Sequence, residues 1–554
     1  MLKKIIIGIF CFIFVVGSGI GIYIYTLDWN KYKSNVAHRL TEITGLNAQI
    51  EGDLSVKLFP MPEFTMNMVK FSKAGIKDPL IIVNRISAKT ELMPLFSNKF
   101  ILSGMSLTQA NVNIVLDENG NINWAGATKA GPTRSGVLDV SFNDIRLVNA
   151  NITYKNKNKE TSYVIPNING TVNATSLKGP YKINAKFTHN NNEFLVNGDV
   201  ANTNDIITKI TIKNPATSSL FSIDGSISNN KKGVVTFETN NLYDITSIAF
   251  GNDTISNKYA HPLFLSFQYN GDDNGLTLEN FTLKYANNTA GSGKVNINKG
   301  EKAKIFADID MIQFDLDLIG NIAQDIKDSV VAGNKFEEAQ ITKYDTTIDI
   351  KAKNAWLKGT NAQDLILSVN SNDGIIKVNR FGAVFAGDTN IVSSGALKLV
   401  PEYGYNFDIQ FKSNDIKSFA SIYGYNLTKY AENDDKKVIF KNAQGNLAIK
   451  GSINDVEISL KDTLIDASKL NGNIGFVFAE NNKNMILYLN ASKILFDKYL
   501  TTTPLDDDVK LTFSEKLAHH FNLIPWKEAF NVDGLLNIES GVYNDVAFNN
   551  LSIE

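Results

Sequence analysis

Side chains suited to catalysis or metal binding are few in this chain of 554 residues. The histidines number five and are His38, His189, His261, His519 and His520. None belongs to an H-E-x-x-H motif, and adjacent helical residues such as the last pair point about 100° apart, which does not favour a shared metal ion. No G-x-S-x-G elbow or convincing Ser-His-Asp set is present. We therefore expect no enzymatic activity, no metal site and no cofactor; an enzyme would need a pocket where reactive side chains converge.

One segment resembles a phosphate-binding loop. Gly291–Lys294 reads GSGK, but Asn288 replaces the upstream glycine and Val295 replaces the Ser or Thr that should follow. The segment also lies between expected strands, and no helix follows it. We therefore interpret it as part of a strand.

Closely spaced carboxylates are a second candidate. Asp308 and Asp310 are followed by Asp315 and Asp317, and such a cluster could bind calcium or form an acid pair. The interpretation that we favour is a solvent-facing strand followed by a helix start, where the helix dipole stabilises carboxylates.

The composition narrows the possible functions. Lys and Arg total 55 against 57 Asp and Glu, a net charge of -2, which argues against a nucleic-acid partner. The single cysteine, Cys11, lies in the first apolar run, which excludes intrachain disulfides, Cys-based zinc sites and a soluble catalytic thiol. Apolar residues make up 43%, enough for a large core. The length allows three or four domains or one long repetitive assembly.

The N-terminus predicts a membrane anchor. Ile5–Tyr25 contains no charge, and its 21 residues would cross a hydrocarbon core of about 30 Å as a helix. Lys3 and Lys4 favour a cytoplasmic N-terminus. A cleaved signal peptide is the alternative, with Ile5–Val16 as its apolar region. We favour an uncleaved single-pass anchor because the apolar run continues past the glycines to Tyr25; in either case the rest of the chain is exported.

A short helix is expected directly after the anchor, over residues 28–45. Asp28 can cap it and Gly45 can end it in a left-handed conformation. Apolar residues recur at helical spacing between them, at Tyr32, Val36, Leu40 and Ile43.

From about residue 48 onward the dominant hydrophobic period is two. Ile183, Ala185 and Phe187, for example, alternate with Asn184 and Lys186. Such alternation is typical of sheets with one apolar and one polar face. Gly-, Asn- and Asp-rich breaks suit hairpin turns. We predict a mainly β protein with a few interrupting helices. Its mostly antiparallel strands could form a closed sandwich or barrel series, or an elongated, curved sheet that leaves an open groove; the fold class that we adopt, with the resemblance described below, is the groove.

The expected helices are Leu316–Gly333, a short helix from Asp415 to Gly424, and one that begins at Ser514. Weak boundaries lie near 126–136 and 430–438. The predicted regions are the anchor (1–27), the juxtamembrane helix (28–45), an N-terminal β region (46–130), a central β region (131–430) and a C-terminal β/helix region (431–554).

Several segments resemble blocks of the AsmA family. TGLNAQIEGDLSVKLFPMPEFTMNMVKFSKAG (Thr44–Gly75) closely resembles the family's opening, with its Ile-x-Gly-Asp-Leu strand and its Phe-Pro. Ile86–Gly126 is similar to the next block, including Asp-x-x-Gly-x-x-x-Trp ending at Trp124, and Asp144–Asn156 resembles the third. VNRFGAVFAGDTNIVSSGALKL and LNASKILFDKYL resemble later blocks, so the resemblance extends over nearly the whole chain.

The last segment, FNVDGLLNIESGVYNDVAFNNLSIE, resembles the start of the family's C-terminal repeat region and stops at Glu554. We therefore expect either a short member or a C-terminal part that is missing or encoded separately.

The resemblance implies an inner-membrane anchor and a periplasmic β-rich body, related to TamB-like and bridge-like lipid transfer proteins that form a hydrophobic β-groove. It implies phospholipid transfer toward the outer membrane, with phospholipids and the inner membrane as partners. The alternative is a non-enzymatic factor for the assembly or targeting of outer-membrane proteins, which would act through sheet edges.

Candidate groove residues are those on the expected apolar faces. An ordinary sandwich core is the alternative for each of them. They are Leu138, Val140, Phe142, Ile183, Phe187, Ile305, Ile309, Ile348, Ile350, Ile474, Phe476 and Phe478.

Overall fold

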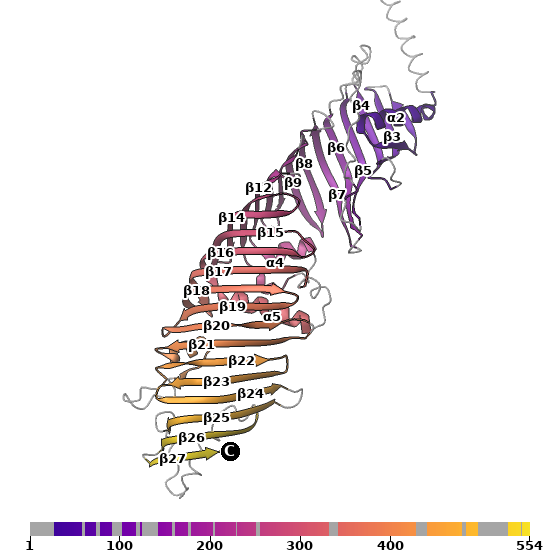
Figure 1. Ribbon diagram of the computed structural model, residues 1–554. Helices are drawn as coiled ribbons and strands as arrows, with labels where there is room; N and C mark the ends of the chain where they lie inside the picture. Colours follow the sequence, from indigo (N-terminus) through magenta and orange to yellow (C-terminus); the bar gives the residue numbers. More distant parts are fainter. Residues whose placement is uncertain are drawn as a thin grey trace, which may run out of the picture. The chain divides into compact units, whose positions relative to one another are not determined.

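The computed structural model describes residues 27–554 except 58–60, 74–77, 91–101, 118–121, 124–141, 158–160, 175–178, 203–204, 229, 251–254, 332–341, 401, 428–439, 479–482, 497–529 and 544–545. The chain divides into two compact units, Met1–Tyr269 and Asn270–Glu554. Both consist mainly of β-strands (Figure 1), which confirms the main feature of the predicted fold class.

The first unit contains β1 to β12 and two helical segments near its start. Its strands are β1 (Asn47–Ile50), β2 (Leu54–Lys57), β3 (Glu63–Ser72), β4 (Ile81–Thr90), β5 (Leu102–Leu116), β6 (Phe142–Asn156), β7 (Thr161–Ala174), β8 (Tyr181–His189), β9 (Asn192–Asn202), β10 (Ile206–Asn214), β11 (Ser219–Ser226) and β12 (Lys231–Thr239). Its helices are η1 (Trp29–Tyr32), α2 (Lys33–Thr44), α4 (Leu242–Phe250) and η2 (Asn257–Tyr259). The boundary between the units falls within β13 (Leu263–Gly271).

The helix predicted over residues 28–45 consists of a 3-10 turn, η1, followed by α2. Asp28 caps the turn by accepting a hydrogen bond from the backbone N–H of Asn30 at 3.2 Å. Gly45 ends α2 at φ 71° and donates to the carbonyl of Thr41 at 2.9 Å, a left-handed cap that glycine adopts without strain. The backbone N–H of Ala48 donates to the Thr41 hydroxyl at 2.9 Å, which ties α2 to β1.

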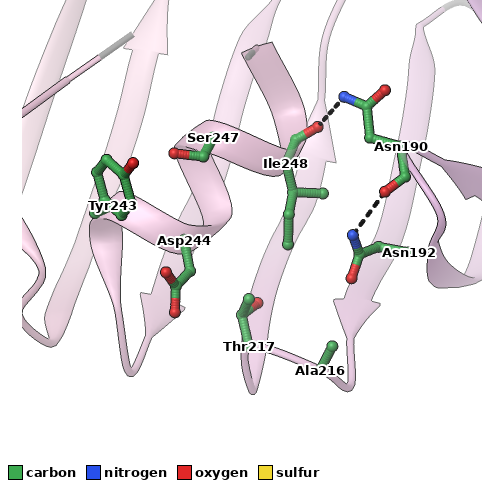
Figure 2. A pocket seen from close by; sticks show the side chains of 8 residues that line it. All are labelled: Asn190, Asn192, Ala216, Thr217, Tyr243, Asp244, Ser247 and Ile248. Atoms are coloured by element: carbon green, nitrogen blue, oxygen red, sulfur yellow. Dashed lines mark hydrogen bonds between the residues drawn. The ribbon is translucent and has the colours of Figure 1, made fainter. Parts of the chain in front are cut away.

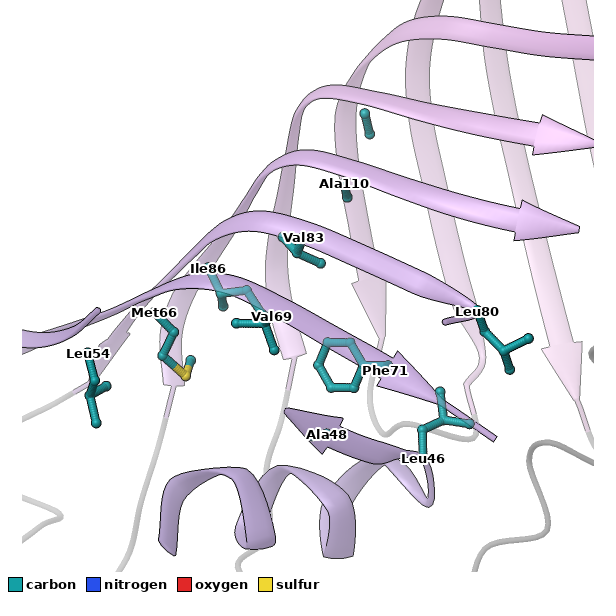
Figure 3. Packing of buried hydrophobic residues seen from close by; sticks show 11 residues of the cluster. Leu46, Ala48, Leu54, Met66, Val69, Phe71, Leu80, Val83, Ile86 and Ala110 are labelled. Atoms are coloured by element: carbon teal, nitrogen blue, oxygen red, sulfur yellow. The ribbon is translucent and has the colours of Figure 1, made fainter. Parts of the chain in front are cut away.

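A buried cluster lies between α2 and the first strands (Figure 3). Val69 and Leu80 are fully buried there, and Val36 and Leu40 of α2 pack against the cluster. The helix thus covers the apolar side of β1, β3 and β4, because apolar residues recur on one side of α2 at the predicted spacing.

Among its described residues, the second unit contains β14 to β27 and two helices. Its strands are β14 (Gly275–Tyr285), β15 (Thr289–Asn298), β16 (Ala303–Asp315), β17 (Tyr344–Leu357), β18 (Thr360–Asn372), β19 (Ile375–Phe385), β20 (Thr389–Lys398), β21 (Gly404–Ser413), β22 (Ala443–Gly451), β23 (Asp455–Ile465), β24 (Ser468–Phe478), β25 (Lys483–Leu495), β26 (Asn531–Tyr543) and β27 (Val546–Ile553). Its helices are α5 (Leu316–Val331) and α7 (Ile416–Ile422), at the places predicted for them.

Where the structure describes the register, neighbouring strands pair mostly antiparallel, and three pairs are parallel: β5 with β6, β16 with β17, and β25 with β26. The sheets are therefore mixed. Helix α5 lies in the connection between β16 and the parallel β17, and it packs against β17. A parallel pair requires a crossover connection, which the helical segment after β16 provides.

Helices α5 and α7 begin at the same edge of the second unit's sheet. The pairings from β16 to β21 give these two strands the same direction, and each helix follows one of them. Both helices contribute to one buried cluster with the strand ends, in which Ala355 and Ala362 are fully buried and Phe419 packs from α7. The two helices therefore cover the end of the sheet at which β16 and β21 terminate.

Bulges bend individual strands. Asn280 in β14, Asp364 in β18 and Asp462 in β23 adopt left-handed φ values of 51°, 51° and 50°. At each of these positions the strand register shifts. Asn and Asp tolerate this conformation better than other residues with a Cβ, and such bulges increase local twist.

Some predictions concern residues that the structure does not describe. They include the helix from Ser514, the boundaries at 126–136 and 430–438, and the membrane span Ile5–Tyr25. Within the described ranges, no helix combines the length and the apolar character needed to cross a bilayer.

Candidate functional site

One face of the second unit's sheet carries three adjacent rows of side chains that lie side by side on successive paired strands. Paired residues share a face of the sheet, so the registers of the strand pairs define each row. We name the rows by predicted residues: the Ile305 row, the Ile348 row and the Ile350 row.

The Ile348 row crosses β14 to β25. Its members are Leu278, Val295, Ala307, Ile348, Val369, Val378, Gly395, Phe407, Ile449, Ile458, Ile474 and Leu487.

The Ile350 row and the Ile305 row flank it. The Ile350 row contains Phe281, Gly293, Ile309, Ile350, Leu367, Phe381, Ser393, Ile409, Leu447, Leu460, Gly472 and Leu489. The Ile305 row contains Leu276, Ile297, Ile305, Thr346, Ser371, Ile376, Leu397, Tyr405, Gly451, Val456, Phe476 and Met485.

No member of the three rows is charged, and nearly all are half-buried; Met485 is the buried exception. A sealed sandwich core would bury large apolar residues at the middle of a sheet. These residues instead retain accessible apolar surface over many strands, which is the property of a binding surface. We call the three rows together the apolar face of the second unit.

Most charges of the second unit's sheet lie on the opposite face; Lys483, beyond the three rows, pairs with Phe478 on the apolar side. Asp308 and Asp310 are exposed there, between the apolar positions of β16. Lys294 pairs with Glu279 at 3.0 Å, and Lys450 of β22 pairs with Glu457 of β23 at 3.0 Å. Over the span of the three rows, the sheet therefore has one charged side and one uncharged side.

Tyr405 is the one tyrosine within the rows. Burial raises the pKa of its phenol, and Tyr403 and Asp455 raise that pKa further. The phenol is therefore neutral at physiological pH, so the apolar face keeps its uncharged character.

The first unit has an equivalent row through Ile183. It contains Phe64, Ala88, Met105, Ile145, Val172, Ile183, Gly198, Ile210, Ile223 and Val235, from β3 to β12. Phe187 lies on the same face and stacks on Phe194 of β9, with ring centroids 4.9 Å apart. We call this side the apolar face of the first unit.

Most of the predicted groove residues that the structure describes lie on these two apolar faces. Ile309 and Ile350 also pack against the buried cluster at the helix-covered edge. Phe476 and Phe478 contact Phe530, at centroid distances of 5.5 Å and 6.2 Å, so the chain itself covers part of their surface.

The remaining predicted residues are at the start of β6 or before it. Phe142 begins β6 and is paired with Ala174. Leu138 and Val140 lie outside the described residues.

The motifs that resembled binding sites have structural roles. The GSGK segment lies within β15. Asp315 accepts from the backbone N–H of Asp317 at 2.9 Å, and Asp317 accepts from that of Lys358 at 2.7 Å, as expected for carboxylates at a helix start. In the part of the chain that is described, no three His, Cys, Asp or Glu side chains form a group that could hold a metal ion.

A cavity beside α4 was not predicted from the sequence. Its volume is about 620 Å³, and Figure 2 shows it between α4 and two hairpin turns. The lining residues are Asn190, Asn192, Ala216, Thr217, Tyr243, Asp244, Ser247 and Ile248. Helix spacing of Leu242, Ile245 and Ile248 could have indicated α4, but the cavity depends on segments that meet only in the fold.

Fold and surface together define a class: a β-strand protein whose sheets present continuous, uncharged apolar faces. Residues 1–257 match the family model described as the AsmA family. The match supports the resemblance to the AsmA family that the motifs predicted, over residues 1–257. Searches of curated proteins and of solved structures found no match.

Proposed function

We propose that this chain transfers phospholipids between the membranes of a bacterial envelope, with the apolar faces acting as a hydrophobic groove for acyl chains. The observation that carries the proposal is the set of three uncharged, half-buried rows that continue from β14 to β25. The match of residues 1–257 to the AsmA family is compatible with this role.

The energetics favour such a surface. Each methylene that leaves water contributes about 0.8 kcal/mol, so a two-chain lipid in water is disfavoured by tens of kcal/mol. One leaflet is about 15 Å thick, half of a hydrocarbon core of about 30 Å. An acyl chain of that length would cross about three strands at a spacing of ~4.8 Å. A face that crosses β14 to β25 therefore offers room for successive positions of a moving lipid, without any catalytic residue.

The location is part of the proposal. Ile5–Tyr25 would anchor the chain in the inner membrane with a cytoplasmic N-terminus, and the strands would lie in the periplasm. Transfer down a concentration difference is a binding function, so we propose no enzymatic activity.

Native mass spectrometry of the full chain, extracted from membranes in mild detergent, tests the proposal. We expect bound species with the masses of phospholipids. A chain that carries no acyl lipid under conditions where a known lipid carrier retains its cargo would overturn it. Photo-crosslinking that captured nascent outer-membrane proteins and no lipid would instead support the assembly role.

A further inference from the structure

The cavity beside α4 adjoins the apolar face of the first unit. Asn192 lines the cavity, and two residues further along β9 lies Phe194, which stacks on Phe187 of the apolar face. At about 3.3 Å per residue, the two positions are roughly 7 Å apart. A polar cavity thus lies within one headgroup's length of a surface suited to acyl chains.

A chain of hydrogen bonds fixes one wall of the cavity. Thr217 donates from its backbone N–H and its hydroxyl to Asn214 Oδ1, both at 2.9 Å. The Thr217 and Ser219 hydroxyls are 2.7 Å apart, and Ser219 donates to Thr239 Oγ1 at 2.7 Å. Asn214, Ser219 and Thr239 are buried, at 2%, 5% and 1% exposure. This network joins the β10–β11 turn to the segment before α4, so the wall is formed before any ligand arrives.

The opposite wall is fixed by the β8–β9 turn. Asn190 and Asn191 adopt φ values of 46° and 61°, the left-handed pair of a tight hairpin turn. Asn190 Nδ2 donates to the carbonyl of Ile248 at 2.8 Å, and Asn192 Nδ2 donates to the carbonyl of Asn190 at 2.8 Å (Figure 2). The first bond joins the hairpin to α4, and the second lies within the hairpin.

The groups left for a ligand include a carboxylate and hydroxyls. Asp244 is the one charged residue among the eight that line the cavity, and Figure 2 shows it extending from α4 toward the turn that carries Thr217. Asn241 Oδ1 already accepts from the backbone N–H of Asp244, at 3.1 Å. The hydroxyl of Ser247 is buried and has no hydrogen-bond partner among the described residues. A buried hydroxyl without a partner is costly, and a ligand would relieve that cost.

This chemistry selects among lipid headgroups. A lone carboxylate disfavours a purely anionic headgroup, because like charges repel. A primary ammonium can donate three hydrogen bonds to carboxylate and hydroxyl oxygens. A quaternary ammonium donates none and is typically held by several aromatic rings, whereas Tyr243 is the one aromatic residue among the described residues of the lining.

We propose that the cavity beside α4 binds the ethanolamine-type headgroup of a zwitterionic phospholipid, with Asp244 on the ammonium group and Ser247 donating to a phosphate oxygen. The acyl chains lie on the apolar face of the first unit, so this inference rests on the proposed function. The cavity then gives lipid transfer a headgroup preference that the uncharged rows alone lack.

A competition experiment tests the site. The full chain in mild detergent receives equal amounts of short-chain phosphatidylethanolamine, phosphatidylglycerol and phosphatidylcholine, and native mass spectrometry gives the ratio bound. We expect wild type to favour phosphatidylethanolamine. Asp244→Asn should reduce its preference over phosphatidylglycerol roughly threefold to tenfold, as expected for one charge-assisted contact. Asp244→Glu, which keeps the carboxylate, should retain the preference.

The matched control is Asp199→Asn. Asp199 is exposed on β9, between Gly198 and Val200 of the apolar face and therefore on the opposite side. The variant Asp199→Asn makes the same change in net charge as Asp244→Asn, and it should leave the ratio of the bound lipids unchanged. If wild type binds lipid but Asp244→Asn has the wild-type ratio, the headgroup site is wrong and the proposed function stands. If wild type binds none of the three lipids, the proposed function fails, and the headgroup site with it.

Discussion

Ile348 of β17 and Ile474 of β24 occupy the same row of the second unit's apolar face, although 126 positions separate them in the sequence. Each strand pairing between them preserves the face, through Val369, Val378 and Gly395 and then through the strands that follow. Because the row contains no charged side chain, a single charge would interrupt it.

The variant Ile474→Asp tests that interruption. A carboxylate amid half-buried apolar side chains must either keep its water or lose its hydration, and both reduce the favourable contact with acyl chains. We expect bound phospholipid to fall about tenfold, which corresponds to about 1.4 kcal/mol. The amount of acyl lipid that remains with the purified chain is the measurement.

The control for this variant is Asn473→Asp. Asn473 is the exposed preceding residue of β24 and faces the opposite side. The variant Asn473→Asp adds the same charge to the same strand, but on the face away from the lipid. Its retention of lipid should therefore match that of wild type. Equal losses in both variants would show that the loss reflects net charge and not the apolar face.

The first unit allows a more direct measurement of contact. A photo-reactive phenylalanine analogue at Ile183 would lie within a row of apolar residues, whereas the same analogue at Asn184 would point to the opposite face. After irradiation in native membranes, we expect adducts with the mass of an acyl lipid at position 183 and none at position 184. Adducts of equal yield at both positions would contradict a one-sided path.

The register rows explain why the sequence predicted so much of this surface. Side chains alternate with period two, so residues such as Ile305 and Ile309 share a face wherever the strand forms. In a hairpin, the residues paired with these positions lie on the same face of the sheet. Bulges could not be predicted in this way, because an Asp or Asn within a strand, such as Asp462, is equally typical of a turn.

Contacts between segments that are distant in the sequence could not be predicted either. The parallel pairing of β16 with β17 brings Ile309 beside Ile350, although the alternation within each strand is the same for either direction. The cavity beside α4 requires Asn190, Thr217 and Asp244 to meet, and none of them belongs to a recognisable motif. Local sequence patterns therefore predicted which residues share a face of the sheet, whereas the cavity depends on tertiary packing that these patterns do not show.

Small side chains beneath α7 lead to a prediction about stability. Ala355 and Ala362 are paired across β17 and β18, and both are fully buried within the cluster that contains Phe385 and Ile422. Ala362→Leu adds three carbons where no space exists and should lower the free energy of unfolding by about 1–3 kcal/mol. Asn361→Leu, at the exposed neighbouring position, should change it by less than about 0.5 kcal/mol. Urea unfolding of both variants gives the comparison, and equal effects would contradict the packing.

A pH dependence is expected at the bulge of β23. Lys469 donates a hydrogen bond to Asp462 at a distance of 2.7 Å, and this bond, with the charge of the lysine, lowers the pKa of Asp462 below its ordinary value of 3.8. A carboxyl whose pKa is lower in the folded state stabilises that state above its unfolded pKa. The contribution disappears as the pH falls through the lower, folded pKa.

Asp462→Asn removes the charge and keeps a residue that tolerates the left-handed φ of 50°. We expect a small decrease in the urea midpoint relative to wild type, constant from pH 7 down to about pH 5. The difference should then shrink through the range below 3.8. Asp408→Asn serves as the control, because Asp408 is an exposed aspartate of β21 without an ion-pair partner among the described residues. A midpoint difference for Asp462→Asn that persists unchanged at pH 2 would mean that the ion pair with Lys469 is not its source.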